Sequence, residues 1–137
     1  MGLDDDTIYE STRRFEVWTW GVGHRGLLLR SNPAAGAPTR IELWFKPAYA
    51  VSLPSWLDDI QISRTSDSAR KRATEVLGRT LADYEDLFVV RSRQGFGWVV
   101  AGGVHGREDD NEYDAPTMFD GWEAGPDVRT LFSSARG

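Results

Sequence analysis

The feature that most restricts the fold of this chain is a strict alternation of residues from Thr39 to Phe45. Ile41, Leu43 and Phe45 occupy every second position, and each is preceded by a residue of another kind, namely arginine, glutamate or tryptophan. Successive side chains of a β-strand point to opposite faces of its sheet, so this pattern predicts a strand with one face in a hydrophobic core. The rest of the chain must therefore supply partner strands and the opposite side of that core.

Several other segments have the composition of strands, and they come as hairpins and meanders instead of alternating with helices. Glycine-containing turns follow the first segment at residues 21–26 and join the last two at residues 93–95. Strands connected by short turns pair in antiparallel fashion. The chain is therefore expected to form a curved antiparallel sheet or open barrel of about seven strands. The expected strands are residues 13–22, 27–30, 39–45, 48–53, 60–63, 87–92 and 96–105.

One substantial helix is expected after the fifth strand, over about residues 67–82. Apolar residues recur there at the three- and four-residue spacing of a helix face. An apolar cluster after Pro126 predicts a second, short helix near the C-terminus. The expected fold class is therefore α+β, with the main helix packed on the sheet. The expected core comprises Phe15, Val17, Ile41, Leu43, Phe45, Val76 and Leu77.

The length of 137 residues fits one ordinary domain. Residues 1–11 show no helical or strand period, so we expect a loose acidic leader before a single domain over residues 12–137. The net charge of −5 argues against non-specific nucleic-acid binding, which needs a surplus of basic residues. No apolar run approaches the roughly 18 residues that cross a bilayer, and the acidic N-terminus is unlike a secretory signal. We therefore expect a cytoplasmic protein with no nucleic-acid partner and no membrane partner.

Two segments resemble ligand-binding motifs but lack the residues that those motifs require. Residues 21–26 match G-x-G-x-x-G, yet the helix that would hold a pyrophosphate does not follow them. The acidic segment 108–114 has enough carboxylates for a cation, but it lacks the glycine and the final glutamate of an EF-hand. We expect residues 107–116 to form a mobile, solvated loop without a tightly bound cation. The chain has no cysteine, which excludes disulfides and thiolate sites, and we expect no cofactor and no metal site.

His24 and His105 are the only histidines, and each lies near an expected turn or strand end. Either imidazole could act as a general base beside a carboxylate. The chain contains neither the G-x-S-x-G motif of a nucleophile elbow nor the H-E-x-x-H motif of a zinc protease. An alternative function is therefore a small hydrolase or cation-dependent enzyme that uses His24 or His105 with the acidic segment 108–114.

Aromatic residues are the most unusual part of the composition, with six Trp, six Phe and four Tyr. Trp18, Trp20 and Trp44 lie on expected strands, opposite the clearest core positions. The three rings form either an exposed binding platform or a second core under the helix. We expect Trp18 to be largely buried and at least one of Trp20 and Trp44 to be partly exposed beside a groove.

The function expected from these features is that of a non-enzymatic binding or protein-interaction module that uses the aromatic sheet face. The residues expected to bind a ligand or partner are Trp20, Trp44, His24 and His105. The partner would be an unidentified protein or small ligand, and a basic partner would suit the acidic chain. Self-association into a homodimer through the sheet edge or the aromatic face is a further expectation. Chains of this composition are common among small bacterial interaction proteins.

Overall fold

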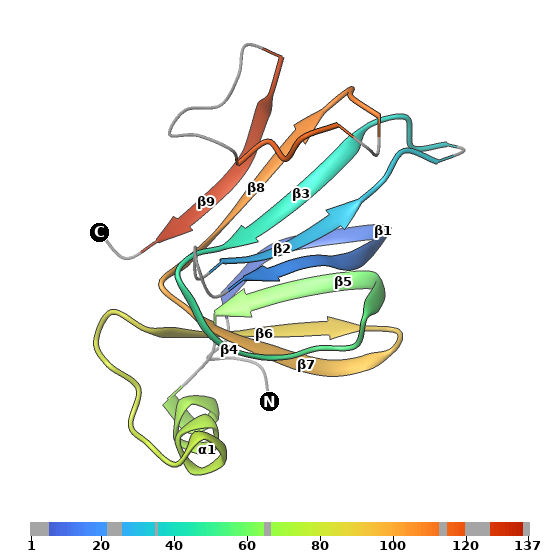
Figure 1. Ribbon diagram of the computed structural model, residues 1–137. Helices are drawn as coiled ribbons and strands as arrows, with labels where there is room; N and C mark the ends of the chain where they lie inside the picture. Colours follow the sequence, from blue (N-terminus) through green and yellow to red (C-terminus); the bar gives the residue numbers. More distant parts are fainter. Residues whose placement is uncertain are drawn as a thin grey trace.

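The computed structural model describes residues 6–21, 26–34, 36–64, 67–112, 115–119 and 127–135. These residues form one antiparallel sheet of nine strands and a single helix (Figure 1). The expected antiparallel sheet is confirmed, but the expected α+β class and the count of about seven strands are wrong, because strands dominate the described chain. The elements in chain order are β1 (Asp6–Gly21), β2 (Gly26–Ser31), β3 (Arg40–Phe45), β4 (Ala48–Ser52), β5 (Trp56–Arg64), α1 (Asp67–Leu77), β6 (Asp86–Ser92), β7 (Gly95–Ala101), β8 (Gly103–Asp109) and β9 (Arg129–Ala135).

The long first strand organises the sheet. The strand order is β4-β7-β6-β5-β1-β2-β3-β8-β9, so β1 is central and β4 and β9 form the two edges. β1 pairs with both β5 and β2, and bulges interrupt its pairing between residues 11 and 14 and between residues 17 and 19. Bulges bend a strand and increase its twist. The two halves of the sheet therefore turn toward each other, and the sheet stays open at its edges instead of closing into a barrel.

The helix is shorter than the expected range of 67–82. It ends at Leu77, because Gly78 adopts a positive φ of 73° and donates its backbone N–H to the carbonyl of Thr74 at 2.9 Å. Glycine takes up this left-handed conformation at helix ends at little steric cost. Within the described residues, no helix is long and apolar enough to cross a membrane.

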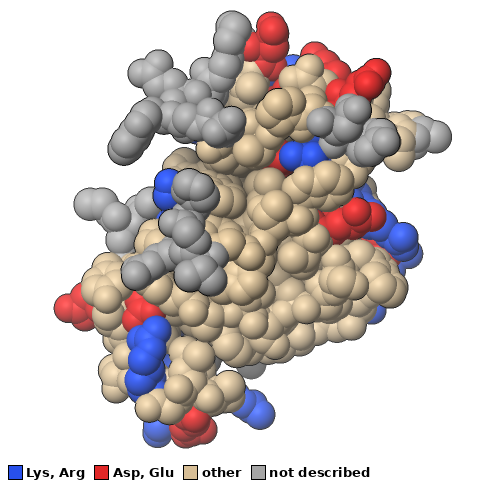
Figure 2. Space-filling model, in the orientation of Figure 1, with Lys and Arg blue, Asp and Glu red and all other residues tan. Residues whose placement is uncertain are grey.

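The helix covers only one corner of the sheet. Ala73 and Leu77 pack with Leu87 and Val100, in a small cluster apart from the main core. Val76 is 68% exposed, so its expected place in the core is wrong. Acidic and basic side chains gather over α1, at the lower left of Figure 2.

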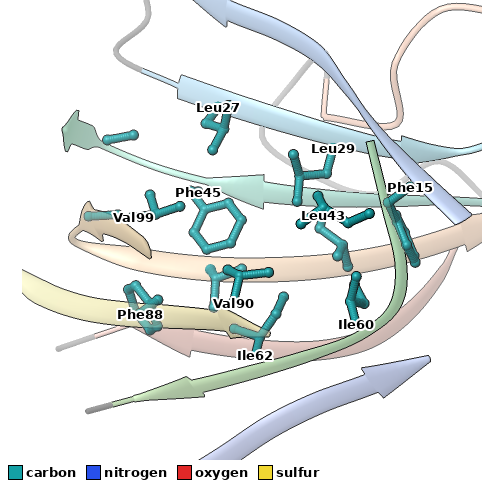
Figure 3. Packing of buried hydrophobic residues seen from close by; sticks show 14 of the residues in the cluster. Phe15, Leu27, Leu29, Leu43, Phe45, Ile60, Ile62, Phe88, Val90 and Val99 are labelled. Atoms are coloured by element: carbon teal, nitrogen blue, oxygen red, sulfur yellow. The ribbon is translucent and has the colours of Figure 1, made fainter. Parts of the chain in front are cut away.

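The main hydrophobic core lies between the two halves of the curved sheet. Phe45 of β3 and Phe88 of β6 meet edge to face with ring centroids 5.9 Å apart, although three strands separate β3 from β6 in the sheet. Figure 3 shows the buried side chains of the two halves pointing toward one another. The expected burial of Phe15, Ile41, Leu43 and Phe45 is confirmed, whereas Val17 is only partly buried at the border of the cluster.

The C-terminal segment forms the edge strand β9, so the expected short C-terminal helix is wrong. Phe132 of β9 stacks on Tyr9 of β1 with ring centroids 4.9 Å apart. Gly106 of β8 leaves room for this ring, because a Cβ atom at residue 106 would lie 2.3 Å from Phe132 Cε1. Of the apolar residues that suggested a helix, Phe132 therefore packs across the sheet, whereas Leu131 is exposed.

Part of the expected leader also belongs to the sheet. β1 begins at Asp6, and its first residues pair with the end of β5 from Asp6 to Ser11. Ile8 and Tyr9 pack against the main core. The expectation of a loose segment is therefore wrong for residues 6–11, and residues 1–5 lie outside the described residues.

Candidate ligand pocket on the outer face of the sheet

The face of β1, β2, β3 and β8 that points away from the core carries two rows of residues in register. Directly opposite residues on neighbouring strands point to the same side of a sheet. One row contains no carboxylate, guanidinium or ammonium group, and the adjacent row alternates in charge. The first row comprises Thr19, Leu28, Trp44 and His105, and the second comprises Glu16, Arg30, Glu42 and Arg107.

A bulge in β1 determines which tryptophans share this outer face. Val17 pairs with Leu29 and Thr19 pairs with Leu28, so Trp18 is the extra residue between the two pairs. The ring of Trp18 lies on the outer face, with the guanidinium of Arg30 4.2 Å from the ring centroid. Its side chain is 38% exposed, so the expectation that Trp18 is largely buried is wrong.

Trp20 lies on the other side of the same strand. It pairs with Leu27, which belongs to the main core, and it is 47% exposed at the end of β1. The bulge therefore separates Trp20 from Trp18 and Trp44, and the expected platform of three tryptophans is not present on one face.

Residues 115–119, which we name the covering segment, lie across the outer face and are held there by buried charges. Glu42 Oε1 accepts hydrogen bonds from Thr117 Oγ1 at 2.9 Å and from the Met118 backbone N–H at 2.6 Å. Arg40 donates to the Ala115 carbonyl and Arg107 donates to the Met118 carbonyl, each at 2.7 Å. Several charge-assisted hydrogen bonds therefore fix the covering segment on the sheet.

The outer-face pocket is a cavity of about 450 Å³ between β1, β2, β3 and the covering segment. The Trp44 ring lies over Gly26, where a Cβ atom would come within 2.0 Å of it, and the ring stacks on Phe119 with centroids 6.0 Å apart. The pocket is lined by Trp18, Thr19, Leu28, Arg30, Trp44, Lys46, Ala115, Pro116, Thr117 and Phe119. Its volume lies within the usual range of small-molecule pockets.

His105 lies beside the pocket but does not line it. It is opposite Trp44 in the sheet, and its Nδ1 is 2.6 Å from Ser133 Oγ on β9. Burial lowers the pKa of His105 below 6.5, and the positive charges of Arg107 and Lys46 lower it further. His24 lies outside the described residues.

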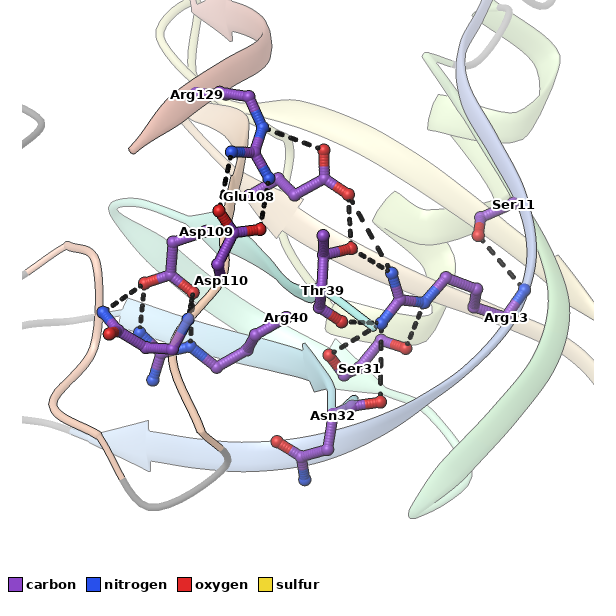
Figure 4. Close-up of polar contacts among 11 residues, drawn as sticks. Ser11, Arg13, Ser31, Asn32, Thr39, Arg40, Glu108, Asp109, Asp110 and Arg129 are labelled. Carbon is purple, nitrogen blue, oxygen red and sulfur yellow. Dashed lines mark hydrogen bonds and ion pairs between the residues drawn. The ribbon is translucent and has the colours of Figure 1, made fainter. Parts of the chain in front are cut away.

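The acidic segment is only partly a loop. Residues 107–109 belong to β8, so the expected loop over 107–116 is wrong at its start. Asp109 is buried and forms a bidentate ion pair with Arg40, in which Nε and Nη2 of Arg40 donate to the two carboxylate oxygens at 3.0 and 2.6 Å (Figure 4). Burial alone would raise the pKa of Asp109, but the hydrogen bonds from Arg40 and Asn111 and the charge of Arg40 outweigh it and lower the pKa.

Glu108 and Asp110 of this segment also have protein partners. Glu108 Oε2 accepts a hydrogen bond from Thr39 at 2.6 Å, and Arg129 lies between Glu108 and Asp110 at 3.4 and 3.2 Å (Figure 4). Across the described ranges, no group of three or more His, Asp or Glu side chains is arranged to hold a metal ion. Glu108, Asp109 and Asp110 therefore act as ion-pair partners of arginines.

Of the residues expected to bind a ligand, Trp44 lines the pocket and Trp20 and His105 do not. Sequence reasoning missed Arg30, Lys46 and Phe119. The signal for Phe119 was present, because Met118 and Phe119 are an apolar pair after a polar stretch. No family model matches the chain, and comparison with curated proteins and with solved structures gave no match either.

Proposed function

We propose that this protein is a non-enzymatic binding protein whose outer-face pocket holds a planar, largely apolar ligand. The observation that carries the proposal is the cavity of about 450 Å³ bounded by Trp18, Trp44 and Phe119. Aromatic side chains give flat ligands a large contact area and favourable stacking geometries. The hydroxyls of Thr19 and Thr117 supply a few polar contacts in the lining, as in small-molecule sites generally.

The walls of the pocket are held in place before any ligand binds. Trp44 is fixed between Gly26 and the ring of Phe119. Trp18 rests on Arg30, whose guanidinium is in turn bonded to Glu42. A binding site whose side chains are already ordered loses less conformational entropy on binding. This arrangement supports a role in binding and gives the pocket a defined shape.

The proposal is tested by titrating the protein with phenylnaphthylamine, an uncharged planar dye that becomes fluorescent in apolar surroundings. Trp18→Ala and Trp44→Ala should each weaken dye binding about tenfold or more. Loss of one stacking ring costs about 1–3 kcal/mol, and 1.4 kcal/mol corresponds to a factor of ten in affinity.

Trp56→Ala is the matched control, because Trp56 is 47% exposed and lies on β5 outside the outer-face pocket. This variant should bind the dye like the wild type. Far-ultraviolet circular dichroism and a thermal melt show whether each variant is folded. The proposal is wrong if the wild type does not bind the dye, or if folded Trp18→Ala and Trp44→Ala proteins bind it unchanged.

A further inference from the structure

Among the described residues, the charged side chains that line the outer-face pocket are both basic, namely Arg30 and Lys46. Arg30 is 3% exposed, and its Nε and Nη2 lie 2.8 and 2.7 Å from Glu42 Oε2. Glu42 is fully buried and does not line the pocket. The carboxylate of Glu42 therefore balances Arg30 from behind and presents no negative charge to a ligand.

Lys46 is exposed and directly follows β3, at the border of the pocket. In the part of the chain that the structure describes, it has no ion pair with a carboxylate. His105 lies on β8, the strand next to β3. Burial is the main cause of its lowered pKa, and the positive charges of Arg107 and Lys46 lower the pKa further. Among the described residues, no carboxylate therefore balances the positive charge at the Lys46 end of the pocket.

The aromatic walls already have cations against them. The guanidinium of Arg30 is 4.2 Å from the centroid of Trp18, and that of Arg107 is 4.4 Å from the centroid of Phe119. An aromatic site for a cationic ligand uses the attraction of its rings for that cation. A second cation here would meet Arg30 and Lys46 in the same pocket, so the charges disfavour an ammonium ligand and favour an anion.

We infer that the ligand of the outer-face pocket is a planar aromatic anion, with its ring against Trp18 and Trp44 and its acidic group at Lys46. The inference rests on the proposed binding function and adds the chemical class of the ligand. A carboxylate, sulfonate or phosphate would accept hydrogen bonds from the Lys46 ammonium group. Arg30 is already paired with Glu42, so the net positive charge of the described lining is that of Lys46.

The test compares two dyes that share one ring skeleton, anilinonaphthalene sulfonate, which is an anion, and phenylnaphthylamine, which is neutral. Lys46→Gln should weaken binding of the sulfonate dye about two- to fivefold, the range expected for an exposed ion pair. The same variant should bind the neutral dye with an affinity within about twofold of the wild-type affinity, the accuracy expected of such a titration. Lys46→Glu should weaken the sulfonate dye further, because it places a like charge at the acidic group.

Lys71→Gln is the matched control, because Lys71 is the only other lysine of the chain and is exposed on α1. It removes the same charge and should change the binding of neither dye. Salt provides a second measurement: raising NaCl from about 20 mM to about 500 mM should weaken only the sulfonate dye, because salt screens exposed charges.

The inference is overturned if Lys46→Gln leaves both dyes unchanged or weakens both equally. In that case the proposed binding function stands, provided that Trp18→Ala and Trp44→Ala still weaken the dyes. If the tryptophan variants bind both dyes like the wild type, the proposed function itself fails. The two outcomes are therefore distinguishable within one set of titrations.

Discussion

At the scale of single residues, the close approach of Gly26 and Trp44 determines the shape of the pocket. Any side chain at residue 26 would occupy the space of the Trp44 ring, since a Cβ atom there would lie 2.0 Å from Trp44 Cη2. Glycine is the residue that leaves a neighbouring ring free to lie flat on the backbone. The position of Trp44 thus depends on the absence of one methyl group on β2.

Gly26→Ala should therefore displace Trp44 and weaken binding of phenylnaphthylamine about tenfold. The added methyl group also overpacks the site, at a cost of about 1–3 kcal/mol in the free energy of unfolding. Gly21→Ala is the control, because no heavy atom lies within 4 Å of a Cβ atom built there. Dye titration and urea denaturation measure both effects. If Gly26→Ala matches Gly21→Ala in both measurements, Trp44 does not depend on Gly26.

At the scale of elements, the covering segment both bonds to charged side chains of the sheet and forms one wall of the pocket. Its residues Thr117 and Phe119 line the cavity, while Thr117 and Met118 bond to Glu42. The charged row on the outer face therefore has a structural role, because it anchors a segment without secondary structure of its own. A loop that forms part of a binding site on a rigid sheet is a common arrangement.

Thr117→Val keeps the shape of the side chain but removes its hydroxyl, which donates to Glu42 and accepts from the Phe119 backbone N–H at 3.2 Å. We expect a loss of about 1.5–3 kcal/mol in the free energy of unfolding, because one of the two lost hydrogen bonds has a charged partner. Dye affinity should fall about two- to fivefold, equivalent to about 1 kcal/mol or less, because a less firmly held wall must be ordered on binding. Thr130→Val, at an exposed threonine on β9, should change neither quantity. An unchanged affinity with reduced stability would show that the covering segment is not part of the binding wall.

The sequence predicted well those strands in which apolar and polar residues alternate along a short stretch of chain. The alternation of residues 39–45 identified β3 and its buried positions, because a strand with one face in the core requires that period. The C-terminal helix was wrong because Phe132 packs against Tyr9, more than a hundred residues away. Contacts with a distant strand make this segment a strand and not a helix, and the local residue pattern of 127–135 does not reveal such contacts.

The candidate site was predictable only in part, for a related reason. Trp44 was identified from its outward position on a strand with a clear period. The bulge at Trp18 shifted the register of β1 and moved Trp20 to the other side, and a one-residue shift of this kind exchanges the faces of a strand. Arg30 and Glu42 are fully buried in the structure. They were overlooked because charged residues on an outer face are usually solvated.

At the scale of the whole molecule, buried and paired acids make the fold sensitive to low pH. The pKa of Glu85 is lowered mainly by its hydrogen bonds from Arg79, and the pKa of Asp109 is lowered by its bonds to Arg40 and Asn111 despite burial. An acid with a lowered pKa in the folded state stabilises the fold above its unfolded pKa, here 4.5 for glutamate and 3.8 for aspartate. That contribution is lost as the pH falls through the folded pKa, so the titration of these acids changes the stability only below about pH 5.

His105 should control the pH dependence above that range. Its pKa is lowered from 6.5 by burial and by Arg107 and Lys46, so the unfolded chain binds its proton more readily than the folded chain does. Stability is then complete above about pH 6.5 and declines as the pH falls below it, because protonation favours the unfolded state. His105→Gln removes this titrating group, so its free energy of unfolding should decline less than that of the wild type between about pH 7 and about pH 5. Urea denaturation across this range measures the difference, with His24→Gln as the control at the only other histidine. An equal decline in the wild type and in His105→Gln would show that protonation of His105 is not what destabilises the fold.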